Sequence, residues 1–125
     1  MQNIVLVGIG GFIGTILRYS LNNWVYQLLA YPLFPYGTMI VNILGCLAIG
    51  FLGGLAEFHE VFTPTLRLFI FIGILGGFTT FSSFGYDTFG LLRGGQFLLA
   101  FINVATQVFI GIGAVWVGFI CARIL

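Results

Sequence analysis

The sequence predicts an all-α integral membrane protein, a single domain over residues 1–125 with four transmembrane helices, the third of them broken near Gly76-Gly77. Composition gives the first argument, because 60% of the residues are hydrophobic and only 6% are charged, whereas soluble domains carry about 25% charged residues. The apolar runs are long and do not alternate with polar residues, which argues against a transmembrane barrel. In lipid, backbone polar groups must be satisfied within the segment, and this favours helices.

The first expected span covers residues 3–21, long enough to cross a hydrocarbon core of about 30 Å. Gly10 and Gly14 have the spacing that lets two helix backbones approach closely. Arg18 is expected in the last turn of this span. Residues 22–37 contain a tryptophan, several tyrosines and two prolines, a composition typical of a loop with an aromatic belt at the membrane interface.

The second expected span covers residues 38–56, where Thr38, Asn42 and Gly45 share one helical face. The third covers residues 66–92, a stretch of roughly 40 Å at the helical rise. This is longer than the membrane core requires, and a break near Gly76-Gly77 accounts for the excess.

The fourth expected span covers residues 97–125 and contains the polar residues Asn103, Thr106 and Gln107. Arginines at the span ends then predict orientation, because basic residues collect on the cytoplasmic side. Arg67 and Arg123 fall on the side of the termini, whereas Arg18 and Arg93 fall on the other. An equal count favours insertion in both directions and an antiparallel, dual-topology homodimer; the alternative is an orientation set by other features.

Polar side chains inside a membrane span are costly, so each is a candidate for function. Here they are hydroxyls and amides, which donate hydrogen bonds to an anion without bringing negative charge, and they are Asn42, Thr79, Thr80, Ser82, Ser83, Asn103, Thr106 and Gln107. The edges of Phe81 and Phe84 carry the positive end of the ring quadrupole and could face the same anion. The competing interpretation is that the hydroxyls bond back to their own helices and the rings fill a core.

Several function classes are disfavoured by the composition. Cys46 and Cys121 lie in apolar runs as small packing residues, and a single histidine leaves no Cys-His metal cluster. A net charge of +1 indicates no nucleic-acid partner. No nucleophile and base pair is visible, so we expect that the protein is not an enzyme.

Residues 76–84, GGFTTFSSF, resemble the GG-x-TTFSTF signature of the CrcB/Fluc fluoride channel family, with Ser83 in place of the threonine. The resemblance covers nearly the whole chain. It also includes Gly10-Gly11, Gly14 and Arg18 in the first span, Gly37-Thr38, Val41-Asn42 and Gly45 in the second, and Asn103-Val104 in the fourth.

This resemblance implies a fluoride-selective channel in the cell membrane of a bacterium or a similar cell. It would export fluoride passively, protect the cell from fluoride toxicity, and work as an antiparallel homodimer. The pore residues that it implies are Asn42, Phe81, Phe84, Thr80, Ser82, Ser83, Thr106, Gln107 and Arg18. It also implies a structural Na⁺ ion at the dimer centre, held by the main-chain carbonyls of Gly76 and Thr79.

Two other functions remain open as alternatives. A small multidrug-type, proton-coupled transporter is also a four-span antiparallel dimer, but it needs a carboxylate in its first span, and residues 3–21 contain none. A non-transporting membrane assembly subunit, held together by its glycine faces, would show no ion flux after purification.

Overall fold

The computed structural model describes all residues from Met1 to Leu125 and is entirely helical. Four helices are long and apolar enough to cross a membrane. Two of them are continuous, α1 (Gln2–Leu28) and α2 (Tyr36–Phe58). The other two are composite. The third comprises α3 (Pro64–Arg67), the π-helical η1 (Leu68–Leu75), α4 (Gly76–Phe78) and α5 (Phe81–Arg93), and the fourth comprises α6 (Phe97–Ala105), the π-helical η2 (Thr106–Ile110) and α7 (Gly111–Ile124).

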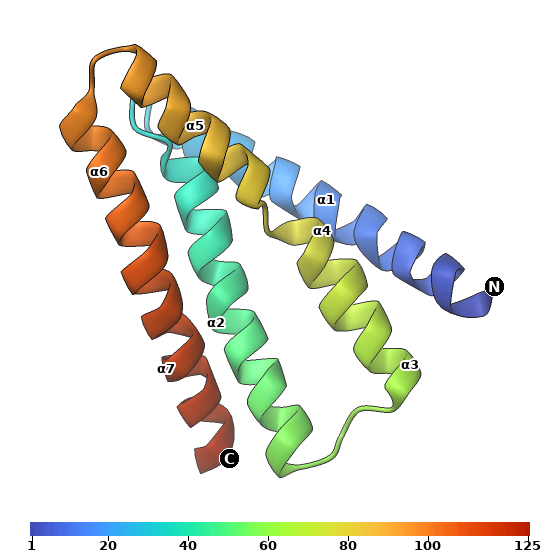
Figure 1. The fold of residues 1–125 in the computed structure, drawn as a ribbon. Coiled ribbons are helices and arrows are strands. Elements are labelled where there is room, and N and C mark those ends of the chain that lie inside the picture. Colours follow the sequence, from blue (N-terminus) through green and yellow to red (C-terminus); the bar gives the residue numbers. More distant parts are fainter.

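Successive transmembrane helices alternate in direction, and they form two close pairs (Figure 1). In one pair α2 lies along α7, and in the other α1 packs against η1 and α4. The segment α5 lies against α6 at the far end of the molecule from the chain termini. The two pairs meet mainly where α1 packs against α2, with smaller contacts of α2 with η1, α4 and α5.

Glycines allow the helix backbones to approach closely in both pairs. A methyl group added at Gly14 would overlap the Ile74 carbonyl oxygen, and one added at Gly77 would lie 2.6 Å from the Gly11 carbonyl oxygen. In the other pair, a methyl group at Gly50 would overlap the carbonyl oxygen of Val115. The packing role expected for Gly14 is therefore confirmed, and Gly50 has the same role in the other pair, since any side chain at either position would push the helices apart.

The break in the third transmembrane helix lies just after the glycine pair. Gly76 and Gly77 are helical, whereas Thr79 (φ −81°, ψ 158°) and Thr80 (φ −151°, ψ 113°) are extended. Gly77 serves the contact with α1, and the threonines interrupt the helix. Thr80 then starts α5 as its N-cap, because its Oγ1 accepts a hydrogen bond of 3.1 Å from the Ser83 N–H.

The first helix extends well beyond the expected residue 21. It continues to Leu28, because the chain has no proline or glycine between residue 21 and Pro32. The interfacial turn is correspondingly short, and Ala30 and Tyr31 adopt positive φ values of 53° and 55° there. Arg18 is therefore not in a last turn. It lies within the helix. The arginines at the ends of the transmembrane helices are then Arg67 and Arg123 on the side of the termini and Arg93 on the other side.

Little of the chain is buried by its own contacts. Only 19 of 125 residues are buried, and Val41 and Asn103 are the largest side chains that are fully enclosed. Large apolar side chains cover the outside of all four helices. Such a surface is stable in lipid or against another apolar protein surface, and it is not stable in water.

Candidate functional site

The centre of the site is a pair of hydrogen bonds between Asn42 on α2 and the backbone of Thr80 at the helix break. The Thr80 N–H donates to Asn42 Oδ1 at 2.8 Å, and Asn42 Nδ2 donates to the Thr80 carbonyl at 3.0 Å. One amide side chain thus satisfies both polar groups of an extended residue at membrane depth. This is the condition under which a broken helix is tolerated there.

The break removes four helical hydrogen bonds, those of the N–H groups of residues 80–83, and two of these N–H groups find other acceptors. In a continuous helix the Thr80 N–H would bond to the Gly76 carbonyl and the Ser83 N–H to the Thr79 carbonyl. Here the first donates to Asn42 and the second to Thr80 Oγ1. The Gly76 carbonyl has therefore lost its helical donor, and the Thr79 carbonyl instead accepts from Arg18 Nη1 at 3.2 Å.

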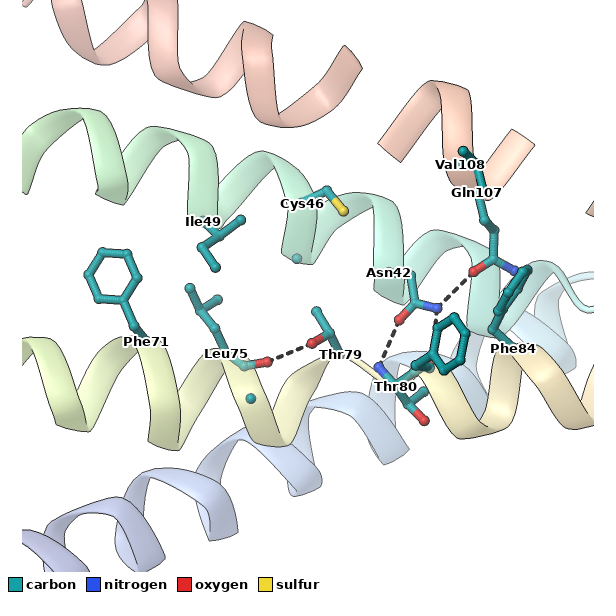
Figure 2. Close-up of a pocket in the computed structure, with 13 residues that line it drawn as sticks. Asn42, Cys46, Ile49, Phe71, Leu75, Thr79, Thr80, Phe84, Gln107 and Val108 are labelled. Atoms are coloured by element: carbon teal, nitrogen blue, oxygen red, sulfur yellow. Dashed lines mark hydrogen bonds between the residues drawn. The ribbon is translucent and has the colours of Figure 1, made fainter. Parts of the chain in front are cut away.

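A cavity of about 380 Å³ opens beside the break, between α2, η2 and the third helix. Figure 2 shows Asn42, Gln107 and Phe84 grouped at one end of it, with Ile49, Leu75 and Phe71 at the other. It brings together seven of the residues predicted from the sequence: Asn42, Gly76, Thr79, Thr80, Phe81, Phe84 and Gln107. The polar end combines amide donors with aromatic rings, as expected for a site that accepts an anion.

A second, smaller cavity of about 210 Å³ lies on the α1 side of the break. Arg18 and Ser83 line this cavity and are absent from the lining of the larger one. Thr80 lines both. The predicted pore residues thus divide between two faces of the same broken helix, and the lining of the smaller cavity is Thr15, Arg18, Tyr19, Asn22, Thr38, Val41, Thr80 and Ser83.

The two phenylalanines of the signature are neighbours. The centroids of the Phe81 and Phe84 rings are 5.5 Å apart, with the planes tilted by 48°. Phe81 is 83% exposed, although it borders the larger cavity. Its ring therefore stands at the surface of this chain, and one side of the site is open.

The fourth transmembrane helix contributes one amide to the site. Gln107 Oε1 accepts a hydrogen bond of 2.7 Å from Asn42 Nδ2. The neighbouring hydroxyl of Thr106 bonds back to the Ile102 carbonyl at 2.7 Å and lines neither cavity. Ser82 is likewise outside both cavities, with its hydroxyl 3.3 Å from that of Thr80.

Two residues outside the predicted pore set connect directly to it. Asn103, which is fully buried, accepts a hydrogen bond of 2.9 Å from Gln107 Nε2 and donates one of 2.9 Å to Thr88 Oγ1. The four-residue spacing of Asn103 and Gln107 on one helix is a signal visible in the sequence. Thr88 gives no such signal, since its partner comes from another helix.

Comparison with known proteins places the chain. The family model described as "CrcB-like protein, Camphor Resistance (CrcB)" matches residues 5–119. The chain belongs to the CrcB-like family. Among CrcB-like relatives, a protein of Geotalea daltonii named "Fluoride-specific ion channel FluC" is 42% identical over 123 residues, which cover 98% of each chain.

Other CrcB-like relatives have similar names. "Fluoride-specific ion channel FluC 1" of Methanosarcina acetivorans is 42% identical over 98% of this chain and 92% of its own length. A "Fluoride-specific ion channel FluC" of Nitratidesulfovibrio vulgaris is 41% identical over the full length of both chains. Family membership and the four spanning helices together identify a multi-pass membrane protein.

Proposed function

We propose that this protein is a fluoride-specific ion channel, which exports fluoride passively and so protects the cell from its toxicity. The names of its relatives point to this ion. The observation that carries the proposal is that Asn42, Gln107 and the start of α5 converge on one cavity at a helix break. A channel needs donors that replace the water around the ion, on a path that is narrow enough to select by size.

The donors suit a small anion. The N-terminus of α5 carries the positive end of a helix dipole, and its first N–H groups have no helical acceptors. No carboxylate lines the larger cavity. The edges of Phe81 and Phe84 add weak positive potential beside it.

Asn42 has no spare donor in this arrangement. Its two amide hydrogens go to the Thr80 carbonyl and to Gln107 Oε1. A fluoride ion that binds Asn42 therefore displaces one of these two acceptors, and the polar groups stay paired before and after it passes. We expect the ion to lose water in steps along this path.

A second copy of the chain completes the proposed channel as an antiparallel, dual-topology homodimer. The exposure of Phe81, at 83%, supports this arrangement, because a pore wall must be enclosed on the side that a single chain leaves open. Arginines at the helix ends remain nearly balanced, with Arg67 and Arg123 opposed to Arg93, so the charge bias toward one orientation is weak.

A structural Na⁺ ion at the dimer centre is also part of the proposal. Hard cations take oxygen ligands, and the Gly76 carbonyl has lost its helical donor at the break. The Thr79 carbonyl already accepts from Arg18 and has one lone pair left for a cation. Two chains related by a two-fold axis would together supply two Gly76 carbonyls and two Thr79 carbonyls. The bound ion would hold the backbone at the helix break in place.

Fluoride efflux from liposomes tests the channel. Fluoride-loaded vesicles that contain the purified protein are expected to release fluoride rapidly once the membrane potential is dissipated, whereas chloride-loaded vesicles retain their chloride. Protein-free vesicles are the control for leakage. Absence of fluoride efflux from correctly folded protein would contradict the proposal and favour a non-transporting subunit.

Dual topology is tested by labelling. In a variant with both native cysteines replaced, Gly94→Cys places one thiol in the turn between α5 and α6. A membrane-impermeant thiol reagent is expected to label this position from both sides of the membrane to equal extents. Labelling from one side only, or crosslinks that trap only parallel pairs, would contradict the antiparallel dimer.

A further inference from the structure

A continuous chain of hydrogen bonds runs from the backbone of α5 through α6 to the pore asparagine. The Thr88 hydroxyl donates to the Phe84 carbonyl at 2.7 Å, and Asn103 Nδ2 donates to Thr88 Oγ1 at 2.9 Å. Gln107 Nε2 donates to Asn103 Oδ1 at 2.9 Å, and Asn42 Nδ2 donates to Gln107 Oε1 at 2.7 Å. We call Thr88, Asn103, Gln107 and Asn42 the amide relay.

The backbone at one end dictates the direction of the relay. A carbonyl such as that of Phe84 can only accept, so it uses the single hydrogen of the Thr88 hydroxyl. Thr88 Oγ1 must then accept from Asn103, which turns the nitrogen of that amide toward Thr88 and its oxygen toward Gln107. Gln107 consequently donates to Asn103 and presents its own oxygen to Asn42.

The backbone at the other end requires the same direction. The Thr80 N–H can only donate, so it faces the oxygen of Asn42. The nitrogen of Asn42 is then left for Gln107, which must accept. Because both ends impose one direction, reversing any amide in the relay would place two donors or two acceptors together.

Neither Thr88 nor Asn103 lines either of the two cavities described above, and Asn103 is completely enclosed. We propose that both are positioning residues: they fix the direction of the Gln107 amide and, through it, hold Asn42 in place for the anion. Gln107 Nε2 makes one hydrogen bond within the protein and keeps a second N–H. The relay thereby leaves one unpaired amide donor on a side chain that lines the larger cavity.

This inference rests on the proposed fluoride channel only for its effect on transport, and the direction of the amide can be tested separately. Thr88→Val keeps the shape of the side chain and removes the hydroxyl, whereas Thr88→Ser keeps the hydroxyl and serves as the matched control. Loss of one hydrogen bond corresponds to between about twofold and tenfold in rate. We expect fluoride efflux to fall by that factor in Thr88→Val and to stay near the wild-type rate in Thr88→Ser.

A spectroscopic measurement reports on the relay itself. The chain has four glutamines and five asparagines, so the ¹⁵N side-chain amide resonances of the full-length protein in detergent are few. The Gln107 resonance is the one missing from Gln107→Leu. In the wild type and in Thr88→Ser we expect one set of signals for this amide, with the N–H that bonds to Asn103 slow to exchange with solvent. In Thr88→Val we expect these signals to be shifted or broadened. Thr88→Ala serves in its place should the valine variant fail to fold.

The outcomes separate the two proposals. A Gln107 resonance that is unchanged in the variant without the hydroxyl would overturn the relay, whatever the efflux. A changed resonance with unchanged efflux would show that the direction of the amide does not matter for transport and would overturn the positioning role. Absence of fluoride efflux from the wild type would overturn the channel function and leave the resonance test valid.

Discussion

Replacing Asn42 by leucine is the sharpest test of the site, because one side chain holds the helix break together. Leucine has the same number and branching of side-chain heavy atoms and removes all three hydrogen bonds, two with the Thr80 backbone and one with Gln107. At about 1 kcal/mol net for each bond, the local loss is about 3 kcal/mol, or roughly a hundredfold in an equilibrium constant. Orphaned N–H and carbonyl groups of Thr80 add to this cost at membrane depth.

We therefore expect Asn42→Leu to lower fluoride efflux from liposomes by about a hundredfold or more. Asn42→Asp is the second variant to compare with Asn42→Leu. Its carboxylate still accepts from the Thr80 N–H but has no N–H for the Thr80 carbonyl or for Gln107, and its charge repels an anion. Both variants should elute as the wild-type protein does in size-exclusion chromatography. Wild-type efflux in a folded Asn42→Leu protein would refute the role assigned to this amide.

Further predictions concern the rings, the glycines and the cation. Phe81→Ile or Phe84→Ile should suppress fluoride efflux without loss of the folded assembly. Phe101→Ile, on the exposed face of α6, is the control and should conduct normally. Equal efflux in all three variants would exclude the Phe81 and Phe84 rings from the fluoride path. Gly14→Ala should destabilise the protein by about 1–3 kcal/mol through overpacking, whereas Gly8→Ala, with nothing within 4 Å, should be neutral in a detergent unfolding assay. Replacing Na⁺ by a large organic cation at constant ionic strength should lower the melting temperature, since a bound ion stabilises the folded state; an unchanged melting temperature would count against the sodium site.

Part of the site was predictable because its residues are unusual for their surroundings. Asn42 and Gln107 are amides within apolar helices, and a polar group at membrane depth stands out in the sequence. The structure joins them directly, at 2.7 Å. Thr106 stood out equally, yet it bonds to its own helix, because a hydroxyl has a single hydrogen, for which a carbonyl of its own helix suffices, whereas an amide has two N–H donors and an oxygen to satisfy.

The position of the helix break was predicted only approximately. A glycine pair is a reasonable signal for an interruption, but Gly76 and Gly77 stay helical and the threonines that follow are extended. Gly77 is needed for contact with Gly11. The end of α1 and the interior position of Arg18 were missed for a related reason: the charge of Arg18 suggests a helix end, whereas its partner is the Thr79 carbonyl, far away in the sequence.

By itself, the sequence determined the class of this protein, its four spanning helices and the glycines along which they pack. Lipid allows few backbone arrangements, so apolar composition and run length are sufficient to select among them. Only the tertiary structure decided where the third helix breaks and which amides meet there. The Thr80 N–H leaves its helix because Asn42, on another helix, offers an oxygen at 2.8 Å, and a hydrogen bond between distant segments has no local signature.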